Sequence, residues 1–394
     1  MNKEVLINVI ASSWPQNQSP PQALFNPSHS FNIPSVLLQI GELTTPPHKG
    51  GISLSEYWAY VRYFNALTSS RSLELTHEYG GLDSHQKTIL SDDFGIGFSI
   101  NYLMSTLNLA PPVNGQFFID SMLGATGGTY SGKKPKKRGP GKSPDYISED
   151  NVGMWHVIEC KGTQTSLEYS NTQLAKGVSQ KKTVSFPVNV RGERLVAGLF
   201  IGSEGADEHS TLTIRDPKAE KPFQVPDDSL GWARDTMNRG ALAASLQQAG
   251  FPATANIVAA PMGPELDARV SKFKNRENLR REYVQIKRAS SINELDSALN
   301  RKVRDGFIGR SVEFDIPSLQ KLTNGKFSKV KVTNGISETF IKRFQKPNDY
   351  ETRPTLDQQL NVENDEMKYS INCDNGFAEI RHGNIYRAKL ELIL

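Results

Sequence analysis

The sequence predicts an α/β fold with an additional α+β region at its C-terminus. The 394-residue chain is long enough for roughly two or three domains with sizeable cores. Between residues 91 and 202, helical periodicity alternates with short apolar runs that are typical of strands. Beyond residue 311, short strand patterns bounded by turn residues dominate. We therefore divide the chain into residues 1–75, a core of residues 76–205 and a C-terminal region of residues 206–394.

Residues 1–75 are predicted to form an irregular and partly helical segment that packs on the core. Residues 12–50 are rich in Pro, Ser, Asn and Gln, a composition that favours irregular structure. Residues 53–67 instead show the periodicity of a helix.

The core begins with a helix predicted over residues 91–107. Ser91 can cap this helix, and Asp92 and Asp93 suit the positive end of its dipole. Inside a helix, Gly95 costs about 1 kcal/mol relative to alanine. We therefore expect that close packing against another element requires this glycine.

The rest of the core is predicted as strands with one further helix. Apolar runs predict strands over residues 116–120, 145–147, 154–161 and 194–202. Residues 171–183 have the spacing of a helix. A leading helix followed by strands, a helix and a final strand is an α/β arrangement.

The C-terminal region is predicted to combine two helices with several short strands. The helices are expected over residues 228–250 and 265–288. The strands are expected over residues 311–316, 328–333, 369–373, 376–381 and 386–394. Asp374-Asn375-Gly376 is a hairpin-turn signal between two of these strands.

Positive charge is concentrated in two places, although the net charge is only +4. Residues 270–346 hold 18 Lys and Arg against 8 Asp and Glu. A loop before residue 145 holds six basic residues and no acidic one: Lys133, Lys134, Lys136, Lys137, Arg138 and Lys142. Such local excess indicates a polyanion partner, with a solvated charged surface as the alternative. The loop also resembles a nuclear import signal.

Composition excludes several classes of protein. Two cysteines, Cys160 and Cys373, exclude a disulfide framework and a cysteine-rich zinc site. No apolar run approaches the roughly 20 residues of a membrane helix. The first eleven residues lack the unbroken apolar stretch of a secretion signal. We therefore expect a cytoplasmic protein without membrane contacts.

The residues that carry chemistry lie on two neighbouring predicted strands. Side chains alternate between the faces of a strand, so Glu159 and Lys161 point the same way. If the two strands pair as a hairpin, Asp145 meets Glu159 at one edge. Adjacent carboxylates repel unless a cation lies between them, and one or two carboxylates with water and phosphate oxygens bind Mg²⁺. Lys161 can then orient or deprotonate water, or stabilise charge that develops on phosphorus.

Pro144-Asp145 and Glu159-Cys160-Lys161 resemble the two half-motifs of the PD-(D/E)xK nuclease superfamily, whose fold is called restriction-endonuclease-like. The resemblance covers roughly residues 85–205. It implies a mixed sheet flanked by helices, in the order helix, strand, strand, strand, helix, strand. It also implies that Asp145 and Glu159 bind Mg²⁺ or Mn²⁺ and that Lys161 is the catalytic lysine.

The resemblance implies further site residues on the two flanking helices. Many members of the superfamily add an acidic ligand from the first helix, which here would be Asp92 or Asp93. Some place a supporting Gln or Lys on the second helix, where Gln173, Lys176 and Gln180 share one face. A favourable helix dipole and a solvated helix face are the respective alternatives.

The leading hypothesis is a divalent-metal-dependent endonuclease that acts on DNA rather than RNA. Its build resembles bacterial defence or restriction effectors. The C-terminal region would contact nucleic acid or a partner protein, and cutting of both DNA strands would favour a homodimer. The alternative is a non-catalytic nucleic-acid-binding or assembly protein that retains the fold. A third hypothesis is an enzyme that only a partner or a small ligand activates.

Overall fold

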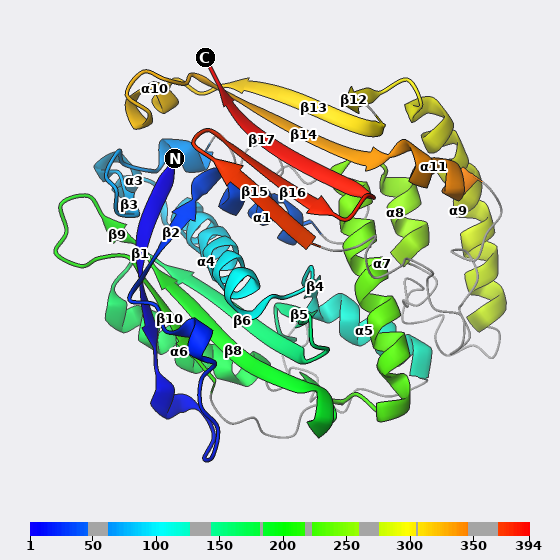
Figure 1. The fold of residues 1–394 in the computed structure, drawn as a ribbon, viewed down its shortest axis with the longest axis horizontal. Coiled ribbons are helices and arrows are strands. Elements are labelled where there is room, and N and C mark those ends of the chain that lie inside the picture. The colour runs from blue at the N-terminus through cyan, green and yellow to red at the C-terminus, as the bar shows by residue number, and fades with distance from the viewer. Residues whose placement is uncertain are drawn as a thin grey trace.

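In the part of the chain that it describes, the computed structural model contains two large sheets with helices around them, together with two short two-stranded pairs (Figure 1). The residues that it describes are 1–45, 62–126, 143–181, 184–216, 223–259, 276–304, 306–345 and 369–394. A seven-stranded mixed sheet is flanked by helices, and a six-stranded antiparallel sheet lies in the C-terminal region. The predicted α/β class with a helix-flanked mixed sheet is therefore confirmed.

The mixed sheet has the strand order β2-β1-β10-β8-β6-β5-β4. Its strands are β1 (Asn2–Val9), β2 (Ser28–Asn32), β4 (Val113–Asn114), β5 (Tyr146–Glu149), β6 (Trp155–Thr163), β8 (Arg191–Phe200) and β10 (Thr211–Arg215). The pairs β6–β8 and β1–β10 are parallel, and the other neighbours are antiparallel. The sheet thus extends beyond residues 76–205 on both sides.

Helices α4 (Ser84–Leu107) and α6 (Leu167–Lys181) cover opposite faces of this sheet. Gly162 of β6 lies against α4, and Gly198 of β8 lies against Leu174 of α6. Gly198 is opposite Lys161 in the sheet register. Because side chains alternate along a strand, Gly162 faces away from Gly198. The centre of the sheet is therefore buried on both faces.

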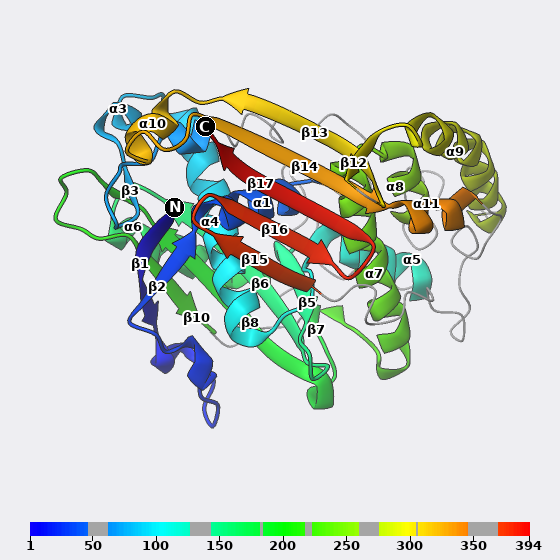
Figure 2. The ribbon, with the colours of Figure 1, turned by 45° about the horizontal axis from the view of Figure 1, so that its top comes forward.

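The prediction of irregular structure over residues 12–50 is wrong for β2 and for α1 (Ile33–Leu43). Helix α1 begins where the side chain of Asn32 accepts a hydrogen bond from the backbone N–H of Ser35 at 3.0 Å. Its residues Ile33 to Gly41 are all buried. The helix packs on α4 on one side and on the C-terminal sheet on the other (Figure 2). Tertiary burial thus overrides the polar composition around it.

The C-terminal sheet has the strand order β12-β13-β14-β17-β16-β15. Its strands are β12 (Lys302–Arg304), β13 (Phe307–Asp315), β14 (Lys329–Ser337), β15 (Tyr369–Asp374), β16 (Phe377–His382) and β17 (Tyr386–Ile393). The predicted hairpin between β15 and β16 is confirmed, and Gly376 has a φ of +111°, which favours glycine. The other predicted strands of this region are confirmed with small shifts at their ends.

The remaining helices lie mainly beside the C-terminal sheet (Figure 1). They are α3 (His77–Gly80), α5 (Gly115–Thr126), α7 (Leu230–Gln248), α8 (Pro252–Ala259), α9 (Arg276–Ala298), α10 (Ser318–Leu322) and α11 (Glu338–Gln345). Two short parallel pairs join β3 (Glu74–Leu75) to β9 (Gly202–Ser203) and β7 (Val184–Ser185) to β11 (Phe223–Gln224). No helix in the described ranges is both long and apolar enough to span a membrane.

Several predicted elements differ from the structure. Residues 116–120 are not a strand but part of α5, because the side chain of Asn114 accepts the N–H of Phe117 at 3.0 Å and starts a helix there. In the described chain, α9 ends at Ala298, ten residues beyond the predicted end. Of the helix predicted over residues 53–67, only residues 62–65 are described as helical.

Candidate active site

The hairpin of β5 and β6 brings Asp145 and Glu159 together. Tyr146 is opposite Ile158 in the antiparallel register, so Asp145, one residue earlier, lies across from Glu159. A carboxylate oxygen of Asp145 accepts the backbone N–H of Cys160 at 2.8 Å. The carbonyl of Asp145 accepts the N–H of Gly115 at 2.9 Å. The predicted pairing of these two strands as a hairpin is therefore confirmed, and hydrogen bonds hold both the carboxylate and the backbone carbonyl of Asp145.

Glycines allow helix α4 to cross directly over the end of β6. A Cβ added at Gly95 would lie 2.5 Å from the carbonyl oxygen of Lys161. A Cβ added at Gly162 would overlap the carbonyl oxygen of Ser91. Only glycine permits such backbone contact, so the expected packing reason for Gly95 is confirmed. This crossing holds Asp92, the residue after Ser91, close to the C-terminal end of β6.

Glu159 is a fully buried carboxylate with only one satisfied oxygen. Its Oε1 accepts a hydrogen bond from the ammonium of Lys161. Its Oε2 is buried and meets no donor at hydrogen-bond geometry, although the backbone and carboxyl group of Asp145 lie close enough to lower the pKa values of the pair. Burial, followed by the negative charge of Asp145, raises the pKa of Glu159 to about 8, and the charge of Lys161 opposes this rise. A buried carboxylate oxygen without a partner is costly. The ionised form of Glu159 would therefore need a further positive partner at Oε2.

Lys161 and Asp145 complete a compact group of three ionisable side chains. The side chain of Lys161 is 22% exposed, so it lies between the buried Glu159 and the surface. Burial alone lowers the pKa of Lys161, but the charges of Glu159 and Asp145 outweigh burial and raise it. Burial raises the pKa of Asp145, against the opposing effects of Lys161 and the Cys160 N–H. Lys161 therefore stays positively charged beside two carboxyl groups.

The structure separates the roles of the two acids on α4. The helix begins at Ser84 and is capped by Asp83, not by Ser91, so the helix-dipole explanation for Asp92 and Asp93 is wrong. Although Asp92 is exposed at the surface, loss of water around its carboxyl group raises its pKa, the charge of Lys161 opposes this rise, and the charge of Asp145 adds to it. Asp92 is therefore within electrostatic range of the motif.

Asp93 lies on another side of the helix. Its carboxylate accepts a hydrogen bond from the hydroxyl of Tyr63. Burial raises the pKa of Asp93 to about 6, and the hydrogen bond from Tyr63 opposes this rise. Asp93 thus has a structural partner of its own, whereas Asp92 is influenced by the charges of Lys161 and Asp145.

The other predicted site residues stand apart from this group or outside the described residues. Gln173 is half-buried and Lys176 is exposed on α6, and Leu174 between them packs on Gly198. The side chain of Gln180 lies outside the described residues. So does the whole basic loop: Lys133, Lys134, Lys136, Lys137, Arg138 and Lys142.

Sequence reasoning missed Gln164, which ties the end of β6 to α4. Its side-chain amide donates to the carbonyl of Lys87 at 3.1 Å and to the hydroxyl of Ser91 at 3.3 Å. A polar residue three positions after Lys161 was the available signal. Together with the glycine contacts, this amide fixes the helix relative to the motif strand.

The donor set of this group fits one hard divalent cation bound mainly by Asp145 and Glu159. Mg²⁺ is usually held by one or two carboxylates together with water and phosphate oxygens. The buried, unpartnered Oε2 of Glu159 is the ligand atom that such an ion would satisfy. Among the described side chains, no three His, Cys, Asp or Glu residues form a closed metal-binding cluster.

Comparison of the chain with protein-family models, curated proteins and solved structures finds no match. The site therefore has to be interpreted from its own geometry and chemistry.

Proposed function

We propose that this protein is a divalent-metal-dependent nuclease, with a restriction-endonuclease-like core, that hydrolyses phosphodiester bonds of DNA. The observation that carries the proposal is the buried carboxylate of Glu159, which has one oxygen on Lys161 and the other without a partner, directly across the hairpin from Asp145. A buried carboxyl group whose pKa is raised to about 8, beside a second acid and a lysine, is typical of functional sites rather than of stable cores.

The order of elements around the hairpin supports the same proposal. Along the chain, α4, β4, β5, β6, α6 and β8 follow one another as helix, strand, strand, strand, helix, strand. This is the order implied by the PD-(D/E)xK resemblance, with the helix α5 inserted after the first strand. The two-residue strand β4, rather than residues 116–120, supplies the first of the three strands.

Each residue has a chemical task in the proposed reaction. Asp145 and Glu159 would hold Mg²⁺ or Mn²⁺, which when bound neutralises phosphate charge and lowers the pKa of water. Lys161, which is partly exposed beside Glu159, would orient the attacking water and stabilise the negative charge that develops on the phosphate. Water would attack phosphorus and lose a proton to the solvent, the bond from phosphorus to one ester oxygen would break, and that oxygen would take up a proton from the solvent. Asp92 would add a carboxylate at the exposed side of the site.

Cleavage assays with purified full-length variants test the proposal. Supercoiled plasmid DNA and single-stranded RNA are incubated with Mg²⁺ or Mn²⁺. We expect Asp145→Asn, Glu159→Gln and Lys161→Met each to lower the rate by about 10²–10³-fold or more, because each removes preorganised charge. Glu149→Gln is the matched control, since Glu149 lies on the same hairpin but pairs with Arg234.

The outcomes separate the proposal from its alternative. Cleavage by Asp145→Asn and Lys161→Met at the wild-type rate would refute the site. DNA binding by every variant, with no cleavage by the wild type under either metal, would favour a non-catalytic nucleic-acid-binding protein. Faster cleavage of RNA than of DNA would correct the substrate.

A further inference from the structure

The C-terminal sheet has one apolar face and one charged face. Val332 and Leu390 are opposite each other in the register of β14 and β17 and are buried. Their neighbours Lys331 and Lys389 point to the other face, because side chains alternate along each strand. The apolar face packs on α1, so the charged face is directed away from the core.

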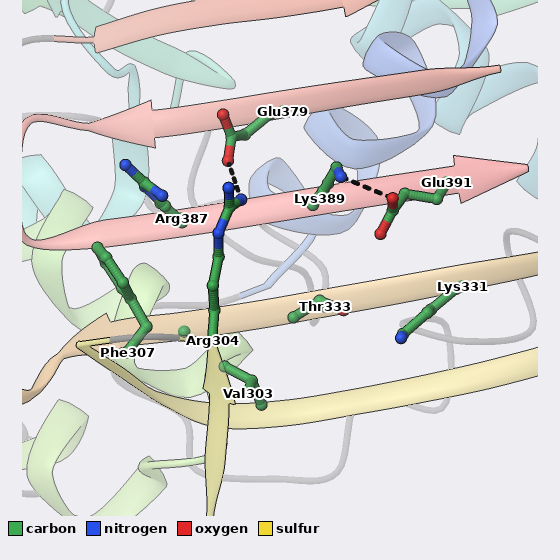
Figure 3. A pocket seen from close by; sticks show the side chains of 10 residues that line it. Val303, Arg304, Phe307, Lys331, Thr333, Glu379, Arg387, Lys389 and Glu391 are labelled. Atoms are coloured by element: carbon green, nitrogen blue, oxygen red, sulfur yellow. Dashed lines mark hydrogen bonds and ion pairs between the residues drawn. The ribbon is translucent and has the colours of Figure 1, made fainter.

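This charged face contains a pocket of about 210 Å³. Its floor lies at Gly335 of β14, which has no side chain to fill the space. A Cβ at Gly335 would lie 3.0 Å from Val303 and 3.1 Å from Phe307, so β12 and the start of β13 form a wall around the glycine. Arg387 and Lys389 of β17 line the opposite side (Figure 3).

The pocket carries more positive than negative charge. Arg304, Lys331, Arg387 and Lys389 line it, together with the carboxylates Glu379 and Glu391. Both carboxylates are already paired. Glu379 binds Arg304 at 3.2 Å and also Arg381, and Glu391 binds Lys389 at 2.6 Å. Figure 3 shows Arg304 reaching from β12 across β14 and β17 to Glu379.

Among the described residues, Arg387 and Lys331 are the lining cations that this network leaves without an ion pair, and Arg387 is the one held in place by an aromatic ring. Its guanidinium lies over the ring of Phe307, 4.8 Å from the ring centroid, which fixes its position. Burial, followed by the positive charge of Arg381, lowers the pKa of Arg387. A bound anion would offset this crowding of positive charge, and an oriented guanidinium can hold phosphate oxygens in a bidentate manner.

We propose that this pocket of the C-terminal sheet binds a phosphate group, with Arg387 as its main ligand and Lys331 and Lys389 as further cations. The phosphate belongs either to the backbone of a nucleic acid or to a free nucleotide. The pocket volume suits one phosphate with part of its sugar. The proposal does not depend on cleavage at the site of Asp145, because it concerns binding alone.

Binding measurements on the full-length protein test this pocket. The probes are a fluorescent single-stranded DNA oligonucleotide without terminal phosphates and, by calorimetry, deoxyadenosine monophosphate. Each is measured with wild type, Arg387→Gln, Lys331→Gln and Lys329→Gln, in EDTA so that no cleavage occurs. Lys329 is the matched control, because it lies on the same strand and face but pairs with Glu313 at 3.2 Å.

We expect Arg387→Gln to weaken binding about tenfold or more, the loss of one charge-assisted hydrogen bond, and Lys331→Gln to weaken it less. Lys329→Gln should change it less than about twofold. If Arg387→Gln loses affinity for the oligonucleotide alone, and the slope of its log affinity against log salt falls by about one, the pocket binds a backbone phosphate. If the variant loses affinity for deoxyadenosine monophosphate alone, the pocket binds a free nucleotide.

Two results would overturn the proposal. One is that Arg387→Gln binds both probes as tightly as the wild type does. The other is an equal loss in Lys329→Gln, which would mean general surface electrostatics. Thermal unfolding of each variant checks that these substitutions on the charged face leave the fold intact. Failure of cleavage in the wild type would leave this test unchanged, so the two proposals can fail separately.

Discussion

Replacing Glu159 by glutamine should stabilise the protein while it abolishes cleavage. Burial and the charge of Asp145 raise the pKa of Glu159 from 4.5 to about 8. At pH 7 the unfolded chain therefore carries an ionised Glu159, whereas the folded protein holds it mostly protonated. One pKa unit corresponds to about 1.4 kcal/mol, so folding at pH 7 costs about 3 kcal/mol relative to folding below pH 4.5.

The sign of this effect sets the pH window. Because the folded pKa is raised, the folded state binds the extra proton, and stability falls as the pH rises from about 4.5 to about 8. Glutamine keeps an oxygen that can accept from Lys161 but has no charge to bury. We therefore expect Glu159→Gln to gain about 1–3 kcal/mol at pH 7 and nothing below pH 4.5.

Urea unfolding of both proteins in EDTA, at several pH values from 4 to 9, measures the difference. Mg²⁺ should then stabilise the wild type, by about 2.7 kcal/mol at one hundred times its Kd, and leave Glu159→Gln nearly unchanged. A variant less stable than the wild type at pH 7 would refute the reasoning. So would a difference between the two proteins that does not vary with pH.

Three further substitutions test the packing and charges that hold the site. Gly162→Ala should destabilise the protein by roughly 1–3 kcal/mol in thermal unfolding, because the new Cβ overlaps the carbonyl of Ser91. Asp93→Asn should gain up to about 3 kcal/mol at pH 8 and nothing below pH 4 in urea titrations, because burial raises the pKa of Asp93 to about 6. Asp235→Ala should cost about 3–5 kcal/mol, because it removes the carboxylate that forms an ion pair with the buried Arg239 at 2.8 Å.

Each of these predictions has a control or an outcome that contradicts it. Gly80→Ala places a Cβ in open space, so a loss as large as that of Gly162→Ala would contradict the contact argument. For Asp93, an equal gain at pH 4 and pH 8 would exclude a titration effect. For Asp235, the double variant with Arg239→Met should recover part of the lost stability.

The hairpin with its motif, and most of the C-terminal strands, could be predicted from the sequence. In both places local signals agree with the final structure. Side chains alternate in polarity over β14 and β17, and Asn375-Gly376 supplies the turn between β15 and β16. The pairing of Asp145 with Glu159 then follows from strand geometry alone.

The errors arose where distant parts of the chain decide the local structure, or where a short apolar run fits a helix and a strand equally well. Helix α1 is buried between α4 and the C-terminal sheet, a position that its polar flanking sequence does not indicate. The apolar run over residues 116–120 fits a helix and a strand equally well, and only the cap at Asn114 selects the helix. The unpaired position of Arg387 depends on which carboxylates its neighbours occupy, which no sequence pattern specifies.

The choice between Asp92 and Asp93 shows how helix geometry resolves what the local sequence leaves open. Adjacent residues on a helix point about 100° apart, whereas residues three or four apart share a face. Asp92 shares its face with Gly95, which contacts the backbone of Lys161, and Asp93 shares its face with Gly97, which contacts Ile40 of α1. The contact that each glycine makes therefore shows which element lies against that face of α4. Asp92 is therefore the acid on the face of α4 that packs on β6, because it shares that face with Gly95.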